Sequence, residues 1–327
     1  MASRHDHVLL GDIGATNARF ALLAGGALGP VECVAVDDHP HFADAVRAFL
    51  GQQRRRAIDR ALVAVAGPVE ANCCMLTNCS WRIDADELSR EFGVPAVRVI
   101  NDFEATAWSL PCLRQADLRA LGDGRSVPGA PMAVLGPGSG LGVACLVPGS
   151  DGGVVIATEG GHATLPGTSP REDAVIDRLR RQLGHVSAER AISGPGLENL
   201  YQAIAAVDAM NVPARNAAEI TDAALAGACP TSRAALDMFC AMLGTIAGNV
   251  ALSFGARGGV YIAGGIAPRI VDHLARSEFR ARFEAKGRFR GYLEAIPTSV
   301  ITHKDATFMG LKSLAEGDIN SAATSRS

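Results

Sequence analysis

The residues best suited to chemistry lie in a glycine-rich segment near the N-terminus, between two hydrophobic runs. Its members are Gly11, Asp12, Ile13, Gly14, Ala15, Thr16 and Asn17. Glycines let the backbone bend and approach a ligand closely, and the successive N–H groups of such a turn bind anions. A carboxylate repels a phosphate unless a cation lies between them, so Asp12 indicates Mg²⁺, held directly or through water. The segment predicts a phosphate-binding β-hairpin; the alternative is an ordinary hairpin turn built from glycine and aspartate.

Two later segments extend this plan. Gly138, Ser139 and Gly140 lie between a second pair of apolar runs, and the two hairpins together could hold a triphosphate. Gly264 and Gly265 follow a short apolar run, where an adenosine can lie flat on bare backbone. No Gly-x-x-x-x-Gly-Lys-[Ser/Thr] motif occurs, which excludes a P-loop. The order of these segments resembles that of the sugar-kinase, actin and Hsp70-type ATPases. Without a P-loop, and with only three lysines in the chain, the phosphate charge must be met by Mg²⁺ and backbone N–H groups.

Polar side chains that could serve a second substrate follow two further apolar runs. Asn101 and Asp102 come directly after the run 97–100, and open α/β sheets bind ligands at the carboxyl ends of their strands. Asn-Asp is also a good helix N-cap, and the residues alone leave both interpretations open. Glu159 and His162 flank a glycine pair after the run 154–158, although a lone histidine is more often structural than a ligand or base.

Composition favours a two-domain α/β enzyme in the cytoplasm. The 327 residues are 48% hydrophobic and 20% charged, enough for a large core that is normally divided between two domains. A net charge of −3 offers no basic surface for nucleic acid, and no signal peptide is expected before Gly11. The uncharged stretches 126–150 and 238–256 contain glycines and polar residues, so they are predicted to be core and not membrane spans. The spacing of the eight cysteines predicts neither zinc nor disulfides.

The elements that must position these residues are visible as alternating patterns. Asp84 caps a helix that runs to Gly93, between the strand-like runs 61–66 and 97–100, as in an α/β domain. Ser169 caps a second helix up to Gly184, and Thr231 is predicted to cap the longest helix, which ends near residue 254. Prolines after residue 110 interrupt the pattern and place a domain boundary near 112.

In this order, the motifs closely resemble those of the bacterial ATP-dependent glucokinases of the hexokinase/actin superfamily. They comprise Gly11-Asp12-x-Gly14-x-Thr16-Asn17-Ala18-Arg19, Ile100-Asn101-Asp102-Phe103, residues 138–142, Glu159-Gly-Gly-His162, residues 184–190 with 193–196, and residues 283–289. The resemblance covers residues 8 to 315 and implies an α/β, two-domain actin-like ATPase (ribonuclease H-like) fold with the active site in the interdomain cleft. It implies a small α/β domain, 1–112, completed by a C-terminal helix, 303–316, and a large α+β domain, 113–302. The polar tail, 317–327, is expected to be disordered.

The resemblance also implies a reaction, the transfer of the γ-phosphate of ATP to the 6-hydroxyl of D-glucose. The products are glucose 6-phosphate and ADP, at the entry to glycolysis, and family members are commonly homodimers. The implied glucose ligands are Asn101, Asp102, Glu159, His162 and Glu189, with Asp102 as the catalytic base. The implied ATP contacts are Gly11, Asp12, Ile13, Gly14, Ala15, Thr16, Gly138, Ser139, Gly140, Gly264 and Gly265, with Mg²⁺ held by Asp12 through water. Directed acceptors of this kind select one sugar stereochemistry.

Departures from the family pattern are few, and none removes an implied contact. Ala15 replaces a frequent glycine, Ser139 replaces the usual threonine but keeps the hydroxyl, and Thr164 replaces an acid seen in some relatives. The cysteine-rich zinc motif of the repressor/kinase (ROK) branch is absent. The alternatives are a non-catalytic sugar sensor on the same fold, which usually adds a DNA-binding segment before the first hairpin, or a kinase of another hexose or amino sugar. Polyphosphate as the donor stays open, and we expect no nucleic-acid or membrane partner.

Overall fold

The computed structural model describes residues 7–53, 57–76, 79–150 and 152–324. The chain divides into two compact units, each of which is described by itself. Unit 1 comprises Met1–Leu113, Ser150–Val155 and Lys304–Ser327, and unit 2 comprises Arg114–Gly149 and Ile156–His303. The assignment of these units to the expected domains stays a prediction.

Unit 1 is a mixed sheet with strand order β3-β2-β1-β5-β8, in which β4 also pairs with β2. The strands are β1 (His7–Ile13), β2 (Asn17–Ala24), β3 (Ala27–Leu28), β4 (Glu32–Ala35), β5 (Arg60–Val65) and β8 (Ala96–Asn101). A separate small hairpin pairs β6 (Cys73–Met75) with β7 (Arg82–Asp84). Strands β1, β5 and β8 are parallel, and Ile13, Val65 and Asn101 lie in register. The carboxyl ends of three strands therefore meet at one edge, where the first glycine hairpin and Asn101 lie.

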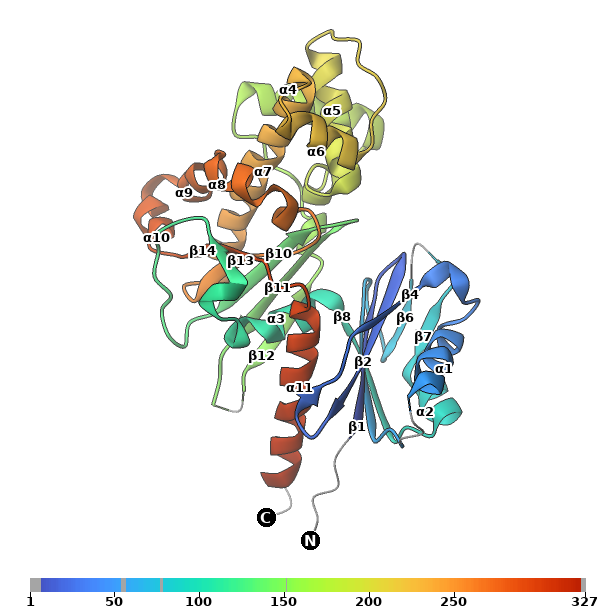
Figure 1. The fold of residues 1–327 in the computed structure, drawn as a ribbon. Coiled ribbons are helices and arrows are strands. Elements are labelled where there is room, and N and C mark those ends of the chain that lie inside the picture. The colour runs from blue at the N-terminus through green and yellow to red at the C-terminus, as the bar shows by residue number, and fades with distance from the viewer. Residues whose placement is uncertain (1–6, 54–56, 77–78, 151, 325–327) are drawn as a thin grey trace. The chain divides into compact units, whose positions relative to one another are not determined.

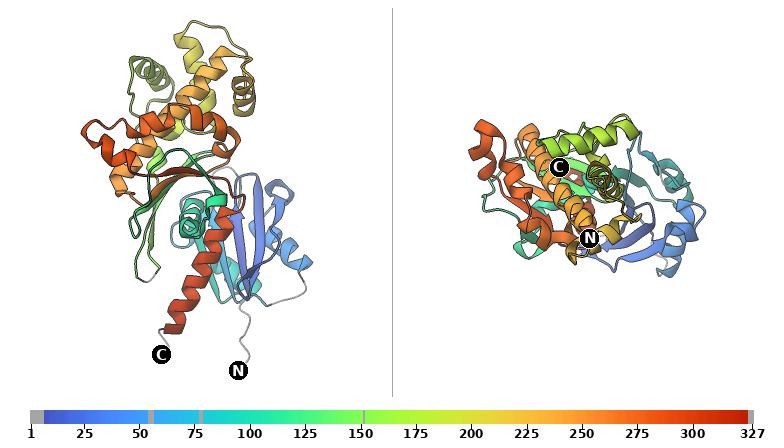
Figure 2. Two further views of the ribbon diagram at one scale, coloured as in Figure 1. Left: turned by 60° about the vertical axis from the view of Figure 1, so that its left-hand side comes forward. Right: turned by 90° about the horizontal axis from the view of Figure 1, so that it is seen from above.

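Alternating side chains along β1 explain why both faces of this sheet are covered. Leu9 and Ile13 pack with α1 (Phe42–Gln52) and α2 (Ala85–Phe92) on one face. Val8 and Leu10 pack with α11 (Ala306–Thr324) on the other. Helix α11 also contacts α3 (Asp102–Ser109) and β1, as Figure 1 and the left view of Figure 2 show.

Unit 2 contains a second mixed sheet, with strand order β12-β11-β10-β13-β14-β9. Its strands are β9 (Leu118–Ala120), β10 (Met132–Pro137), β11 (Leu141–Val147), β12 (Val154–Thr158), β13 (Gly259–Ile262) and β14 (Thr298–Ile301). The helices are α4 (Pro170–Leu183), α5 (Gly194–Val207), α6 (Ala217–Leu225), α7 (Pro230–Phe254), α8 (Val271–Arg276), α9 (Phe279–Glu284) and α10 (Arg290–Glu294). Strands β10 and β13 are parallel, and each runs into one of the glycine segments of the sequence.

Helix α7 is the spine of unit 2. A Cβ added at Gly244 would lie 2.1 Å from the Phe279 carbonyl oxygen, and one at Gly248 would lie 2.6 Å from that of Phe283, so the two glycines let α9 approach closely. Among the described helices, α7 alone is long and apolar enough to cross a membrane, but 78% of its most apolar window is buried inside the protein. Its burial confirms the prediction of a core helix.

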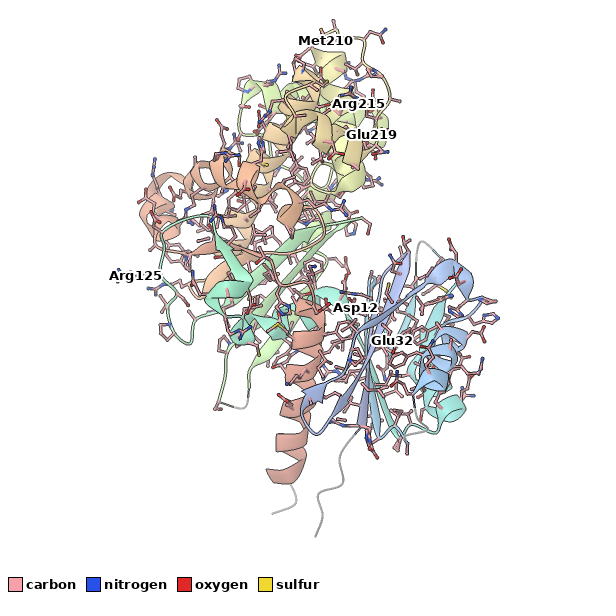
Figure 3. The ribbon with its side chains drawn as sticks, in the orientation of Figure 1. Asp12, Glu32, Arg125, Met210, Arg215 and Glu219 are labelled. Atoms are coloured by element: carbon pink, nitrogen blue, oxygen red, sulfur yellow. The ribbon has the colours of Figure 1, made fainter. Side chains whose placement is uncertain are left out.

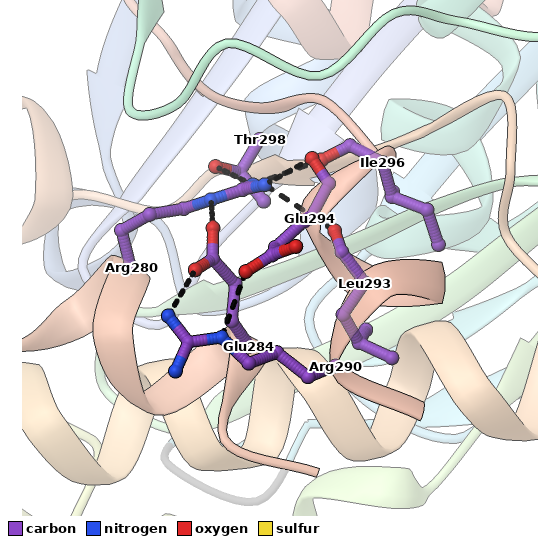
Figure 4. Close-up of polar contacts among 7 residues, drawn as sticks. All are labelled: Arg280, Glu284, Arg290, Leu293, Glu294, Ile296 and Thr298. Carbon is purple, nitrogen blue, oxygen red and sulfur yellow. Dashed lines mark hydrogen bonds and ion pairs between the residues drawn. The ribbon is translucent and has the colours of Figure 1, made fainter. Parts of the chain in front are cut away.

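Arg280 of α9 anchors the end of α10, as Figure 4 shows. Its guanidinium donates to the carbonyl oxygens of Leu293, Glu294 and Ile296 at 3.2, 2.9 and 2.8 Å. These groups lie at and beyond the helix C-terminus, where carbonyls lack partners within the helix. Glu284 accepts from Arg280 Nε at 2.6 Å. The network holds the segment that connects α10 to β14, and β14 pairs with β13.

Two predicted element boundaries are wrong. Helix α7 is capped by Cys229 and not by Thr231, because Pro230 occupies the first helical position and the Cys229 sulfur accepts from the Ser232 N–H at 3.4 Å. Helix α11 continues to Thr324, beyond residue 316, where the expected C-terminal helix ends. Residues 317–324 contain no proline, the residue that most strongly breaks a helix. Residues 325–327 lie outside the described part of the chain.

Candidate active site

The first glycine segment forms the β1–β2 hairpin, but its turn is shorter than the motif. Gly11, Asp12 and Ile13 belong to β1, and only residues 14–16 form the turn. The Gly14 N–H donates to the Asn17 carbonyl at 3.0 Å and closes it. Ile13 is fully buried, and its carbonyl accepts from the Ala66 N–H at 3.0 Å, so the structure does not place this predicted ATP contact at the surface.

Asp12 is held by a residue to which the sequence motif gave no role. The hairpin register places Asp12 directly opposite Arg19 in β2. Arg19 Nε donates to Asp12 Oδ2 at 3.0 Å, a terminal nitrogen bonds the same oxygen, and the other terminal nitrogen reaches Asp305 Oδ1 at 3.2 Å (Asp12 is labelled in Figure 3). Burial raises the pKa of the Asp12 carboxyl, and the charge of Arg19 opposes that rise. The pair of opposite charges across the hairpin could have been found from the register alone.

The donor set around Asp12 limits how Mg²⁺ could bind. One carboxylate oxygen accepts from Arg19, and within the described residues no group of three or more His, Cys, Asp or Glu side chains could hold a metal. Mg²⁺ commonly keeps several waters and binds through one or two carboxylates plus substrate phosphates. A single carboxylate beside a phosphate turn therefore fits an Mg²⁺ ion held mainly by water and phosphate, and it does not fit an Mg²⁺ ion held by protein ligands alone.

Asn101 and Asp102 lie where β8 passes into α3. Asn101 is the N-cap, because its side-chain oxygen accepts from the N–H groups of Phe103 and Glu104 at 2.8 and 3.3 Å. Its amide nitrogen donates to the Gly67 carbonyl at 3.2 Å. Asp102 is the first helical residue, and its Oδ1 accepts from the Phe103 N–H at 2.9 Å. The capping interpretation is thus correct for Asn101, and it leaves a role in the reaction open for Asp102.

In unit 2 the second hairpin lies directly beside the glycine pair proposed for adenosine. The turn 138–140 is closed by a hydrogen bond from the Gly138 N–H to the Gly140 carbonyl at 2.8 Å. A Cβ added at Gly264 would lie 2.4 Å from the Pro137 carbonyl oxygen, and Gly264 has a φ of +80°. Both the close backbone contact and the left-handed conformation therefore require glycine at this position. A Cβ added at Gly265 would meet nothing within 4 Å, which leaves its surface open. The structure brings these two segments together.

Three of the residues predicted to bind glucose also meet in unit 2. Glu159 precedes a 3₁₀ turn, Gly160–His162, and Glu189 belongs to another, Ala188–Arg190. His162 Nε2 lies 3.8 Å from Glu159 Oε2, and His162 Nδ1 lies 3.9 Å from Glu189 Oε1. The two turns are joined by a hydrogen bond from the Ala188 N–H to the Ala163 carbonyl at 2.8 Å. The histidine therefore lies between two carboxylates that come from separate loops.

The sequence patterns did not predict the contacts that join this cluster to the phosphate turn. The Leu141 N–H, directly after the turn 138–140, donates to Glu189 Oε2 at 2.9 Å. Gly161 is packed against the same residue, since a Cβ there would lie 2.0 Å from the Leu141 carbonyl oxygen. No local pattern reveals these contacts, because they join segments far apart in the chain.

Comparisons with known proteins point to one family. A family model described as Glucokinase matches residues 9–318. The chain is 46% identical over 312 residues to the glucokinase of Paramagnetospirillum magneticum, covering 94% of this chain and 97% of that protein. The crystal structure of a glucokinase from an Antarctic psychrotroph aligns with a TM-score of 0.85 at 35% identity, covering 95% of this chain and 99% of that one.

A more distant structure supports the fold. A ROK family glucokinase from Streptomyces griseus, in complex with glucose and AMPPNP, aligns with a TM-score of 0.63 at 19% identity, covering 94% of this chain and 98% of that one. The predicted actin-like ATPase fold is confirmed. Because the family model and the P. magneticum protein both match nearly the whole chain, this protein belongs to the glucokinase family.

Proposed function

We propose that the chain transfers the γ-phosphate of ATP to the 6-hydroxyl of D-glucose, giving glucose 6-phosphate and ADP. The observation that carries the proposal is the cluster of Glu159, His162 and Glu189, one carboxylate of which is hydrogen bonded at 2.9 Å to the residue that follows the phosphate turn 138–140. Hydroxyl-binding side chains beside an anion-binding turn are what a sugar kinase needs. The family match agrees with this assignment.

We assign Asn101, Asp102, Glu159, His162 and Glu189 to the sugar. The carboxylates accept hydrogen bonds from hydroxyl groups, whereas the amide of Asn101 has its oxygen committed to the helix cap and offers only an N–H. Asp102 is the proposed base, and its carboxylate would orient the 6-hydroxyl and accept its proton. Phosphoryl transfer has a loose transition state, so positioning and charge stabilisation contribute more than early proton removal.

ATP is assigned to the glycine segments. The phosphates are proposed to lie against residues 11–16 and 138–140. The Gly14 and Gly138 N–H groups close their own turns, so the N–H groups offered to phosphate would come from the other turn residues. Gly264 with Gly265 would lie against the adenosine. Asp12 would hold Mg²⁺ through water, and the ion, when bound, would neutralise charge on the phosphates. The P. magneticum glucokinase supports a nucleotide-dependent hexose kinase, while the choice of ATP over polyphosphate rests on the adenosine glycines.

The decisive experiment is an ADP-release assay on the pure protein with a panel of hexoses and amino sugars, with and without Mg²⁺. We expect ADP release with glucose that depends on Mg²⁺, and at least about tenfold lower kcat/KM with galactose, whose inverted 4-hydroxyl does not align with the proposed hydrogen-bonding side chains. Sugar binding without turnover would favour the sensor instead. A higher kcat/KM for mannose or an amino sugar would keep the enzyme class and change the substrate.

We also propose a cytoplasmic homodimer, as the family resemblance implies. Light scattering of the purified protein tests the oligomeric state. A mass of one chain, 33.9 kDa, across micromolar concentrations would reject the dimer without affecting the proposed reaction.

A further inference from the structure

One short segment of unit 2, residues 189–194, is hydrogen bonded to both ends of the phosphate turn 138–140. At the first end, the Gly194 N–H donates to the Gly138 carbonyl at 2.8 Å. Just beyond the other end, the Leu141 N–H donates to Glu189 Oε2 at 2.9 Å. The same segment carries Glu189, a proposed sugar ligand. It therefore contacts both proposed substrate sites.

The glycine at the end of the turn lies directly against the Glu189 carboxylate. A Cβ added at Gly140 would lie 2.5 Å from Glu189 Oε2, closer than real Cβ contacts. A Cβ added at Gly138 would meet nothing within 4 Å. Neither residue has a φ in the left-handed region. A side chain at position 140 would therefore displace the Glu189 carboxylate, and position 138 is a matched position without that contact.

The two oxygens of Glu189 face different partners. Oε2 accepts from Leu141, while Oε1 lies 3.9 Å from His162 Nδ1, on the side of the other proposed sugar ligands. The backbone of Glu189 is fixed as well, because Ser193 Oγ donates to the Glu189 carbonyl at 2.8 Å and accepts from the Gly196 N–H at 2.9 Å. The carboxylate is therefore held by its backbone, with one oxygen toward each site.

We infer that Glu189 couples the two substrate sites, an inference that rests on the proposed function. A sugar hydroxyl that donates to Oε1 fixes the carboxylate in the orientation that keeps Oε2 on the Leu141 N–H. This holds the turn 138–140 in the form that presents its N–H groups to phosphate. Whichever ligand binds first supplies the free energy that orders the turn. The second ligand then binds an ordered turn, so each ligand binds more tightly in the presence of the other. Leu141 is a positioning residue in this scheme.

The test is a binding cycle measured by calorimetry. The dissociation constant of glucose is determined alone and with a saturating β,γ-imido analogue of ATP plus Mg²⁺, and that of the analogue with and without glucose. We expect both constants of the unmodified protein to fall by the same factor, about fivefold or more. Gly140→Ala should reduce this factor to below about twofold, since it displaces Glu189. Gly138→Ala should weaken binding of the analogue but leave the coupling factor unchanged.

The outcomes separate this inference from the proposed function. Absence of coupling in the unmodified protein, or equal coupling in both alanine variants, overturns the role of Glu189 while leaving the kinase assignment intact. A protein that binds neither glucose nor the analogue overturns the proposed function. A general structural defect would weaken both ligands in Gly140→Ala without changing the coupling factor, and that result also contradicts the inference.

A second measurement applies if Gly140→Ala does not fold. Glucose alone should slow hydrogen exchange of the Leu141 amide in the unmodified protein by about tenfold or more, since it stabilises the acceptor of that N–H. In Glu189→Asp the shorter side chain cannot reach Leu141, and a glucose concentration that saturates this variant should not slow the exchange. Unchanged exchange of the Leu141 amide in the glucose-bound unmodified protein would overturn the coupling.

Discussion

Asp102 is the residue on which the proposed chemistry depends most. It occupies the first position of α3, after an N-cap supplied by Asn101, so the capping function does not require its carboxylate. Asp102→Asn should keep the fold and glucose binding but lower kcat by about 10²–10⁴-fold, because the amide cannot accept the proton. Steady-state kinetics with calorimetry of glucose binding measure both effects. A variant with near-normal turnover would show that Asp102 is not the base.

Arg19 is the residue that holds Asp12, and it allows a graded test. The Asp12 side chain is only 14% exposed, so removal of its charged partner Arg19 should lower the stability of the fold. Arg19→Gln should lower the free energy of unfolding by about 2–4 kcal/mol and raise the KM for Mg·ATP. Arg19→Lys keeps the charge but loses the fork geometry, and it should fall between that variant and the unmodified protein.

Urea unfolding and ATP titrations at fixed Mg²⁺ would measure these effects. Equal stability of Arg19→Gln and the unmodified protein would mean that the ion pair is incidental. The pair itself was predictable, because the hairpin places opposite charges face to face. The Glu189–Leu141 contact was not, because it joins residues 48 apart in the chain through tertiary structure.

At the scale of the element, the contact between α3 and α11 positions Asp102. A Cβ added at Gly310 of α11 would lie 1.7 Å from the Ala105 carbonyl oxygen of α3. Gly310→Ala should force the helices apart, lower the free energy of unfolding by about 1–3 kcal/mol and reduce kcat as the start of α3 shifts. Thermal unfolding and kinetics test both.

The matched control lies on the same helix. A Cβ added at Gly317 would meet nothing within 4 Å, so Gly317→Ala should be neutral or stabilising by up to about 1 kcal/mol. Similar losses in both variants would show that close packing on α3 is not what Gly310 provides.

Helix boundaries were predictable where a local signal acts alone. Asp84 and Gly93 delimit α2, and Ser169 and Gly184 delimit α4, as their capping chemistry predicts. The predicted cap Thr231 is wrong because Pro230 sets the start of α7, which makes Cys229 the N-cap. The end of α11 was predicted too early, because the polar composition of residues 317–327 is typical of a tail, whereas no proline interrupts the helix there.

At the scale of the whole molecule, the cysteines report on packing in both units. Cys33 and Cys112 are exposed, whereas Cys74, Cys145 and Cys240 are buried. Burial raises the pKa of Cys74 and of Cys145 to about 11 and that of Cys240 to about 12, so these thiols stay protonated well above neutral pH.

A disulfide reagent at pH 8 should therefore modify Cys33 and Cys112 rapidly, and the three buried thiols only after unfolding. Peptide mass spectrometry over time identifies the modified positions. Rapid labelling of Cys145 or Cys240 in the native protein would contradict the packing of the unit 2 core.

The fold class followed from the order of the glycine motifs, because each motif needs a strand before it and these strands belong to two sheets. The composition of the units was harder to predict. Ser150–Val155 is grouped with unit 1, whereas the residues on either side of it in the chain belong to unit 2. No change in composition marks this segment in the sequence.

The most direct test of the central claim is the chemical identity of the product. The protein is incubated with glucose, ATP and Mg²⁺, and phosphorus NMR with proton coupling locates the new phosphate on the sugar. We predict a single phosphate monoester coupled to the protons of carbon 6, formed in equal amount with ADP and almost absent with Asp102→Asn. Phosphate at another carbon, or ADP and free phosphate without a sugar phosphate, would contradict the account.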